Sequence, residues 1–231
     1  MPAKSGFTGF PLETMEFYAE LSKNNNREWF LEHKNIFLAR VMTPAKEFVM
    51  HLGHELLKIH PQIGFDPRTN GQGSIFRIYR DVRFSRSKLP YKTHLGIFFW
   101  LGMNKKESPG YYFHLENNHA LVYAGMHCFS KKSLESYRIS VSNKKKGDEL
   151  KKIFKDLGKD GYELGGLHYK RVPRGFEPDH PHATLLKFNT LFACSKKITK
   201  KNICSAALLS LCLKHCRKMS PLNLWIKKNC T

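Results

Sequence analysis

The sequence predicts an α+β domain, in which N-terminal helices precede a central, largely antiparallel sheet and further helices follow. Apolar residues recur at helical spacing over residues 1–60, and the pattern becomes that of strands over residues 73–129. Within that part, GYYFHLE-NN-HALVYAG predicts a tight hairpin over residues 110–125. With 231 residues, of which 41% are hydrophobic, the chain is expected to form a single domain over residues 1–231.

Three helices are expected in the N-terminal part, and proline and asparagine mark their ends. Pro11 stands at the start of the first helix, where a missing N–H costs nothing. The run of asparagines at 24–26 ends that helix, and either of its last two members can cap the second. Thr43 is expected to cap the third helix, with Pro44 as its first residue.

The hairpin pattern also separates two faces. Asn117 and Asn118 form the expected turn, since asparagine can adopt the positive φ of a two-residue hairpin turn. Alternation then places a wholly apolar set on the face expected to pack on helices: Tyr111, Phe113, Leu115, Ala120, Val122 and Ala124. The other face is mixed and is expected to be solvated or to line a groove: Tyr112, His114, Glu116, His119, Leu121 and Tyr123.

Residues 130–231 are expected to mix helices with short strands. Ser130 and Asp148 stand before two helical patterns, at positions that favour capping. Residues 161–181 are punctuated by glycine and proline, which predicts either a loop or a loop that contains a short strand. TLLKFNTLFA, which follows, predicts either a strand or a short helix followed by a strand.

The C-terminal segment is expected to form a basic amphipathic helix over residues 202–218, which the Ser-Pro pair at 220–221 would stop. Cys204, Cys212 and Cys216 are eight and four residues apart, which places them along one helical face. Because leucines lie between them, this face is interpreted as core rather than as a zinc site.

The net charge of +20 at pH 7 is distributed unevenly along the chain. No acidic residue follows Asp179, and residues 180–231 contain ten lysines or arginines. Such a field attracts polyanions, so it favours nucleic acid, anionic lipid or phosphorylated metabolites as partners. A lysine-rich, solvated surface is the alternative interpretation.

Several classes of protein are not expected. There is no apolar run of about 18 residues, so no membrane-spanning helix is predicted, and the N-terminal residues lack an apolar stretch of signal-peptide length. The common nucleotide-binding, protease and esterase motifs are missing. Six cysteines without a C-x-x-C pair fit reduced thiols and a cytoplasmic protein. No metal and no cofactor are expected, and the sequence predicts no oligomeric state.

The segment RIYRDVRFSRSKLPYK, residues 77–92, combines six cations with a single acidic residue, Asp81. It is expected to form a strand followed by a loop, in which Pro90 fixes the backbone. Phe84 and Tyr91 are expected to anchor the loop while the cations project outward. The arginines matter because their planar guanidinium groups suit carboxylate or phosphate.

Two interpretations of this segment remain open. In the first, Asp81 orients an arginine and an anion from outside completes the cation cluster, with serine hydroxyls and loop amides as further donors. In the second, the carboxylate and an arginine form an ion-pair clasp that locks the loop and binds nothing. Repulsion among so many cations favours the anion site.

With its preceding phenylalanine, the segment resembles the hallmark of a bacterial and fungal protein family, domain of unknown function 2461. Other blocks resemble the family's in the same order: NNNREWF at 24–30, GYYFHLE at 110–116, KRVPRGF at 170–176, DHPHATLLK at 179–187 and SPLNLWI at 220–226. The resemblance covers nearly the whole chain and implies a single α+β domain. It supplies no catalytic residues, and the basic tail with four cysteines from Cys204 on is less typical of the family.

The sequence thus predicts a protein that binds or processes a phosphate-bearing ligand, without deciding whether it is an enzyme. Asp81 and His114 are the candidates for a catalytic role. The expected ligand contacts are Arg77, Arg80, Arg83, Ser85, Lys88, Tyr91, Lys92 and Tyr112. The alternative is a non-catalytic nucleic-acid-binding protein that uses the basic C-terminal segment. The second alternative is a structural or interaction module in which the segment is only a clasp.

Overall fold

The fold is described by a computed structural model, which covers residues 6–69 and 72–231. Over these residues the strands are β1 (Ile63–Gly64), β2 (Leu95–Leu101), β3 (Gly110–Leu115), β4 (His119–Met126), β5 (Glu163–Leu167), β6 (Phe188–Cys194) and β7 (Ile198–Thr199). They form an antiparallel sheet in the order β1-β2-β3-β4-β6-β5, and β7 pairs with β4. Helices precede and follow the strands, so the predicted α+β class is confirmed.

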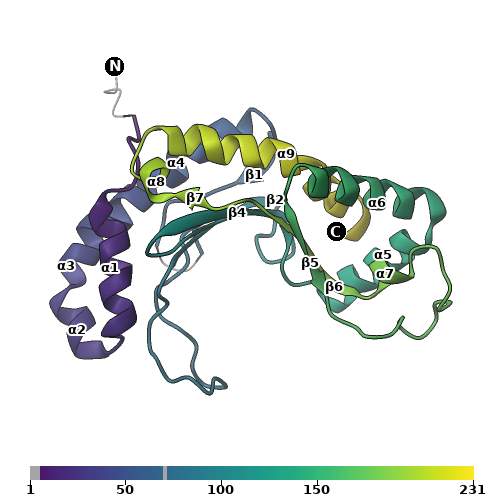
Figure 1. Ribbon diagram of the computed structural model, residues 1–231, viewed down its shortest axis with the longest axis horizontal. Helices are drawn as coiled ribbons and strands as arrows, with labels where there is room; N and C mark the ends of the chain where they lie inside the picture. The colour runs from purple at the N-terminus through teal and green to yellow at the C-terminus, as the bar shows by residue number, and fades with distance from the viewer. Residues whose placement is uncertain (1–5, 70–71) are drawn as a thin grey trace. The chain divides into compact units, whose positions relative to one another are not determined.

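Figure 1 colours the elements from purple at the N-terminus to yellow at the C-terminus. The elements belong to two compact units. The first unit contains the chain up to Phe99, together with Tyr112–Leu121 and Lys197–Lys214. The second unit contains Trp100–Tyr111, Val122–Lys196 and His215–Thr231. The single domain expected from the sequence stays a prediction.

The N-terminal helices of the first unit run almost without interruption. They are α1 (Leu12–Lys23), α2 (Arg27–Glu32), α3 (Lys34–Ile36), the π-helix η1 (Phe37–Met42) and α4 (Thr43–Leu57). The side chain of Asn26 accepts a hydrogen bond of 2.9 Å from the N–H of Trp29 and caps α2, as predicted. Thr43 does not cap α4, because the chain stays helical through η1 and the Thr43 hydroxyl donates to the carbonyl of Leu38 at 3.1 Å.

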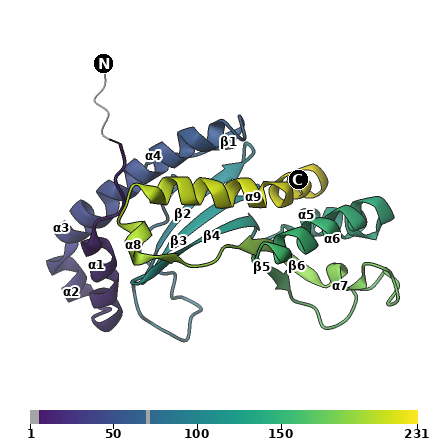
Figure 2. The ribbon, with the colours of Figure 1, turned by 45° about the horizontal axis from the view of Figure 1, so that its top comes forward.

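The apolar face of β3 carries the core of the first unit. Phe113 is 2% exposed, and its ring centroid lies 4.6 Å from that of Phe48 in α4 and 5.9 Å from that of Phe10. In Figure 2, α4 and the beginning of α9 (Ala207–Cys230) lie on the same side of strands β2, β3 and β4. The hydrophobic side of this sheet is therefore covered, and its other side remains for polar groups.

The two predicted faces of the hairpin are confirmed. The six residues of the apolar set are buried, and the six of the mixed set are partly exposed. The turn differs from the expectation, because neither Asn117 nor Asn118 has a positive φ. The N–H of Glu116 donates to the carbonyl of His119 at 3.0 Å, which closes the hairpin without that conformation.

The second unit contains α5 (Lys131–Ser142), α6 (Lys144–Lys159), α7 (Ala183–Leu186) and the later part of α9. Ser130 caps α5 as predicted and accepts a hydrogen bond of 3.1 Å from the N–H of Ser133. Asp148 caps nothing, because α6 begins at Lys144 with Asn143 as its cap. TLLKFNTLFA forms the short helix α7 followed by strand β6, one of the two predicted arrangements.

The C-terminal helix is longer than predicted. It runs through Pro221 to Cys230, because the residues around the proline are packed within the second unit. Trp225 is buried and its indole N–H donates to the carbonyl of Lys146 at 3.1 Å, while the side chain of Asn223 donates to the carbonyl of Gly110 at 3.0 Å. This packing offsets the hydrogen bond that Pro221 removes.

All six cysteines are free thiols. Cys212 and Cys216 lie on the buried face of α9 as predicted. Cys204 is exposed between α8 (Lys200–Ile203) and α9, so its assignment to that face was wrong: the helix starts three residues after it. Among the described residues, no helix is both long and apolar enough to span a membrane.

Candidate anion-binding site

Residues 77–92 form a loop closed at its base by main-chain hydrogen bonds within the first unit. The N–H of Arg80 donates to the carbonyl of Pro90, and the N–H of Lys92 to the carbonyl of Ile78, both at 2.8 Å. The loop extends away from the strands of this unit in Figures 1 and 2. The strand predicted before it is reduced to isolated bridges, one of which joins Tyr79 to Tyr91.

Tyr91 anchors the base of the loop, as predicted. It is 3% exposed, and its ring stacks on Phe30 of α2 with centroids 4.3 Å apart. Asn25 holds both main-chain polar groups of Tyr91: its amide donates to the carbonyl at 3.0 Å, and its side-chain oxygen accepts from the N–H at 3.1 Å. The sequence pattern suggested only a capping role for this asparagine.

Phe84 is not an anchor, and that prediction was wrong. Its side chain is 96% exposed at the far end of the loop, where the guanidinium of Arg83 lies over the ring at 5.8 Å from the centroid. Burial is confined to the base of the loop, where Ile78 and Tyr91 meet the body of the unit. An apolar residue near the tip therefore has no core to enter.

Asp81 and Arg83 form an ion pair within the loop. A guanidinium nitrogen of Arg83 lies 2.7 Å from a carboxylate oxygen of Asp81, and a second hydrogen bond of 3.0 Å joins the two groups. These hydrogen bonds lower the pKa of Asp81 to about 2. Because both side chains are exposed, water screens the pair, and it adds little to the stability of the loop.

Two other cations, Arg80 and Lys88, contact polar groups of the loop itself. The guanidinium of Arg80 donates to the hydroxyl of Ser87 at 3.2 Å and to that of Ser85 at 3.5 Å. The ammonium of Lys88 donates to the carbonyl of Val82 at 3.1 Å. Hydroxyl and carbonyl oxygens orient these side chains but do not neutralise them, so their charge remains available to an anion.

At the other end of the loop, Lys92 and Arg77 lie close together. The ammonium of Lys92 donates to the carbonyl of Arg77 at 3.0 Å and lies over the ring of Phe76 at 5.5 Å from the centroid. Burial lowers the pKa of Lys92, and the charge of Arg77 lowers it further. The ring of Phe76 also meets that of Tyr112, with centroids 5.8 Å apart, which joins this end to the mixed face of the hairpin.

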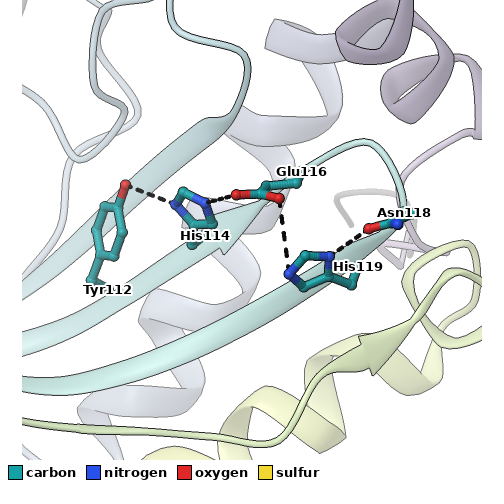
Figure 3. A network of polar contacts seen from close by, with 5 residues as sticks. All are labelled: Tyr112, His114, Glu116, Asn118 and His119. Carbon is teal, nitrogen blue, oxygen red and sulfur yellow. Dashed lines mark hydrogen bonds and ion pairs between the residues drawn. The ribbon is translucent and has the colours of Figure 1, made fainter. Parts of the chain in front are cut away.

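A network of polar contacts covers that face (Figure 3). The Nε2 atom of His114 lies 2.9 Å from a carboxylate oxygen of Glu116, and its Nδ1 atom lies 3.4 Å from the hydroxyl of Tyr112. The Nε2 atom of His119 lies 4.0 Å from the other Glu116 oxygen. Since the carboxylate accepts from Nε2–H, Nδ1 is the acceptor that faces the Tyr112 hydroxyl. The contact with His114 lowers the pKa of Glu116.

His94 completes the network and was missed by the sequence analysis. Its ring lies 4.3 Å from that of His114 between centroids. Burial lowers the pKa of His94 to about 4, and the neighbouring His114 and Lys92 act in the same direction. The imidazole is therefore neutral at pH 7. Its position just before the apolar strand was the available signal, because successive side chains point to opposite faces and His94 precedes the buried Leu95.

Tyr112 is held as a hydrogen-bond donor. Burial raises the pKa of its phenol to about 12, so the hydroxyl keeps its proton at neutral pH. Gly96 on β2 leaves space for it, since a Cβ atom there would lie 2.4 Å from the Tyr112 hydroxyl. Of the predicted ligand contacts, the structure brings together Arg77, Lys92 and Tyr112 through Phe76, with His114 beside them.

The site offers donors, cations and one histidine–carboxylate pair. Cations and hydrogen-bond donors are the groups that suit an anion, and a histidine hydrogen-bonded to a carboxylate is an arrangement that suits proton transfer. Among the described residues, the structure contains no group of three or more histidine, cysteine, aspartate or glutamate side chains placed to hold a metal ion.

Comparison with known proteins supports the resemblance seen in the sequence. No curated protein matches the chain. The sequence profile of one family, described as Conserved hypothetical protein (DUF2461), matches residues 13–225, which include the whole of residues 77–92. The chain therefore belongs to the DUF2461 family of conserved hypothetical proteins.

Proposed function

We propose that the protein binds or processes a phosphate-bearing ligand through residues 77–92 and the adjoining mixed face of the hairpin. The observation that carries this proposal is that the cationic end of residues 77–92 contacts the mixed face of the hairpin. Lys92, beside Arg77, contacts Phe76, which meets Tyr112, while the rings of His94 and His114 are in contact at a tilt of 36°. Cations, imidazole groups and a phenol hydroxyl thus share one face, which suits the binding of an anion.

The electrostatics of the segment support an anion from outside. Asp81 pairs with Arg83, whereas Arg80 and Lys88 contact uncharged oxygen atoms. Lys92 is half-buried, and the charge of Arg77 makes its protonated form less favourable. A bound phosphate would relieve this repulsion and stabilise the folded state. A clasp needs a buried ion pair, and the Asp81–Arg83 pair is exposed.

Should the protein act as an enzyme, the two candidate residues have different roles. His114 faces Glu116 through one ring nitrogen and Tyr112 through the other, which suits proton transfer. Asp81 has a pKa lowered to about 2, so it stays ionised at neutral pH and orients Arg83. Charge stabilisation dominates transfer at phosphorus, so hydrolysis or transfer of a phosphoryl group is the reaction class that this cluster suits best.

Thermal unfolding with pyrophosphate tests the proposal. Pyrophosphate should raise the Tm of the wild-type protein, and the Lys92→Gln and Arg77→Gln variants should lose most of that increase. Lys106→Gln is the matched control, since it removes an exposed lysine from the loop between β2 and β3. No increase in the wild-type Tm, or equal increases in all four proteins, would reject the site.

Nucleic-acid binding through residues 180–231 is the second candidate. Its support is a run of exposed lysines in the first unit around β7 and α8, namely Lys197, Lys200 and Lys201. Such binding should weaken steeply with salt in a gel-shift titration, and no binding at low salt would exclude it. We also propose a cytoplasmic location, which the six free thiols support.

A further inference from the structure

We infer that residues 76–92 form a stacking platform for single-stranded nucleic acid. This inference rests on the proposed function, because it names the class of the phosphate-bearing ligand. It differs from the second candidate above, which uses residues 180–231. The evidence is the pattern of exposed aromatic rings along the segment and the cations placed over them.

Three aromatic side chains of the segment are exposed. Phe76 is 40% exposed, Tyr79 is 53% exposed and Phe84 is 96% exposed, whereas Tyr91 at the base is 3% exposed. Aromatic side chains exposed so close together in the chain are typical of a binding surface. The segment thus uses one ring as an anchor and presents the other three to solvent.

Cations lie over two of these rings. The ammonium of Lys92 is 5.5 Å from the centroid of Phe76, and the guanidinium carbon of Arg83 is 5.8 Å from the centroid of Phe84. A nucleotide offers a flat base and a phosphate, and a ring beside a cation matches both parts. Proteins that bind single strands combine aromatic platforms with a basic path for the backbone in this way.

Tyr91, the anchor of the loop, holds the ring of Tyr79 in place. Tyr79 meets Tyr91 with centroids 5.4 Å apart and Phe30 with centroids 6.2 Å apart. Because Asn25 fixes the main chain of Tyr91, the ring of Tyr79 is supported on one side while half of its surface faces solvent. A supported ring loses little freedom when a base stacks on it.

The pattern favours a single strand over a membrane or a duplex. A loop that enters a membrane presents neighbouring apolar side chains, whereas Phe84 lies between Arg83 and Ser85, and Arg86 follows. A duplex hides the faces of its bases in the stack, so exposed rings have no base to receive there. An unpaired base offers both faces to such a ring.

Fluorescence anisotropy with labelled oligonucleotides tests the platform. Wild-type protein should bind a 20-nucleotide oligo(dT) or oligo(U), and Phe84→Ala should weaken that binding about 5- to 150-fold, the range expected for one lost stack. Phe84→Trp should retain binding, and oligo(dT) should quench the new tryptophan. Met103→Ala is the matched control, because Met103 is equally exposed beside Lys105 and Lys106 in another loop.

The outcomes separate this inference from the proposed function. If Phe84→Ala binds oligo(dT) like wild type while pyrophosphate still raises its Tm, the platform is wrong and the anion site stands. Failure of both ligands with the wild-type protein rejects both proposals. Binding to phosphatidylserine vesicles that depends on Phe84, without binding to oligo(dT), would assign the loop to membranes and overturn the inference. Because Phe84 is almost fully exposed, its variants should keep the wild-type Tm without ligand.

Discussion

Residues 112–121 and residues 78–92 both reverse the chain direction within the first unit, but different forces hold them. In the β3–β4 hairpin every second side chain enters the core, as Phe113 and Leu115 do. In residues 78–92, which we call the basic loop, the buried side chains are those of Ile78 and Tyr91 at its base. A segment fixed only at its base leaves the residues of its tip without a packing role, and they are then available for binding.

The largest effect should come from the hairpin. Phe113→Ala should lower the free energy of unfolding by about 3–5 kcal/mol, because it empties a site enclosed by Phe10 and Phe48. Leu121→Ala, on the mixed face, should cost about 1 kcal/mol or less. Urea unfolding measures both, and equal losses would contradict the assignment of the two faces.

A smaller effect is expected where the basic loop meets the helices. Asn25→Ala removes two hydrogen bonds to the main chain of Tyr91 and should cost about 1–3 kcal/mol. It should also weaken pyrophosphate binding, because the loop base loses its fixed position. Asn24→Ala, which removes an exposed hydrogen bond to the carbonyl of Glu20, is the control and should leave binding unchanged. If both variants bind pyrophosphate like wild type, the anchor does not position the site.

The histidines and the carboxylate on the mixed face of the hairpin should make the free energy of unfolding depend on pH. The pKa of His94 is about 4 in the folded protein and near 6.5 when unfolded, so between these values the unfolded state binds the additional proton. Stability should therefore fall by about 1–2 kcal/mol as the pH decreases from about 6.5 to about 4, after allowance for solvent screening. Glu116, whose pKa is lowered, adds a loss of the same sign at the acidic end.

Urea unfolding across this pH range measures the effect. His94→Gln should flatten the slope, whereas His54→Gln, which changes an exposed histidine of α4, should preserve it. The groups that face His94 are His114, Lys92 and Glu116. A slope that is the same in both variants would show that the acid loss arises elsewhere.

The smallest effect on stability should come from the loop tip. Arg83→Ala should leave the urea midpoint close to that of wild type, because the ion pair with Asp81 is exposed. The same substitution should reduce the Tm increase given by pyrophosphate. A loss of stability comparable with that of Asn25→Ala, together with an unchanged response to pyrophosphate, would instead support the clasp.

Local rules predicted the elements well where the relevant contacts were local. Alternation assigned both faces of the hairpin, and Ser130 and Asn26 cap helices as capping preferences suggest. The predictions failed where distant contacts decide. Pro221 does not end α9, because Trp225 and Asn223 bind the carbonyls of Lys146 and Gly110, and sequence spacing contains no information about those partners.

In the candidate site, too, the sequence indicated some residues correctly and missed those that depend on distant contacts. Residues 77–92 stand out by charge, and the buried Tyr91 was correctly taken as an anchor. Phe84 was misassigned, since hydrophobicity alone does not tell whether a core is within reach. Asn25 and His94 act through residues that are distant in sequence, and only the folded chain brings them to Tyr91 and His114.

The arrangement of the free thiols has a practical consequence for labelling. Cys204 is exposed in the first unit and Cys128 is exposed in the second, while the other four cysteines are buried. Burial raises the pKa of the Cys204 thiol, which slows its reaction with maleimide. The wild-type chain can thus carry a donor and an acceptor fluorophore without any substitution. Energy transfer between them during denaturation would show whether the two units unfold in one cooperative step.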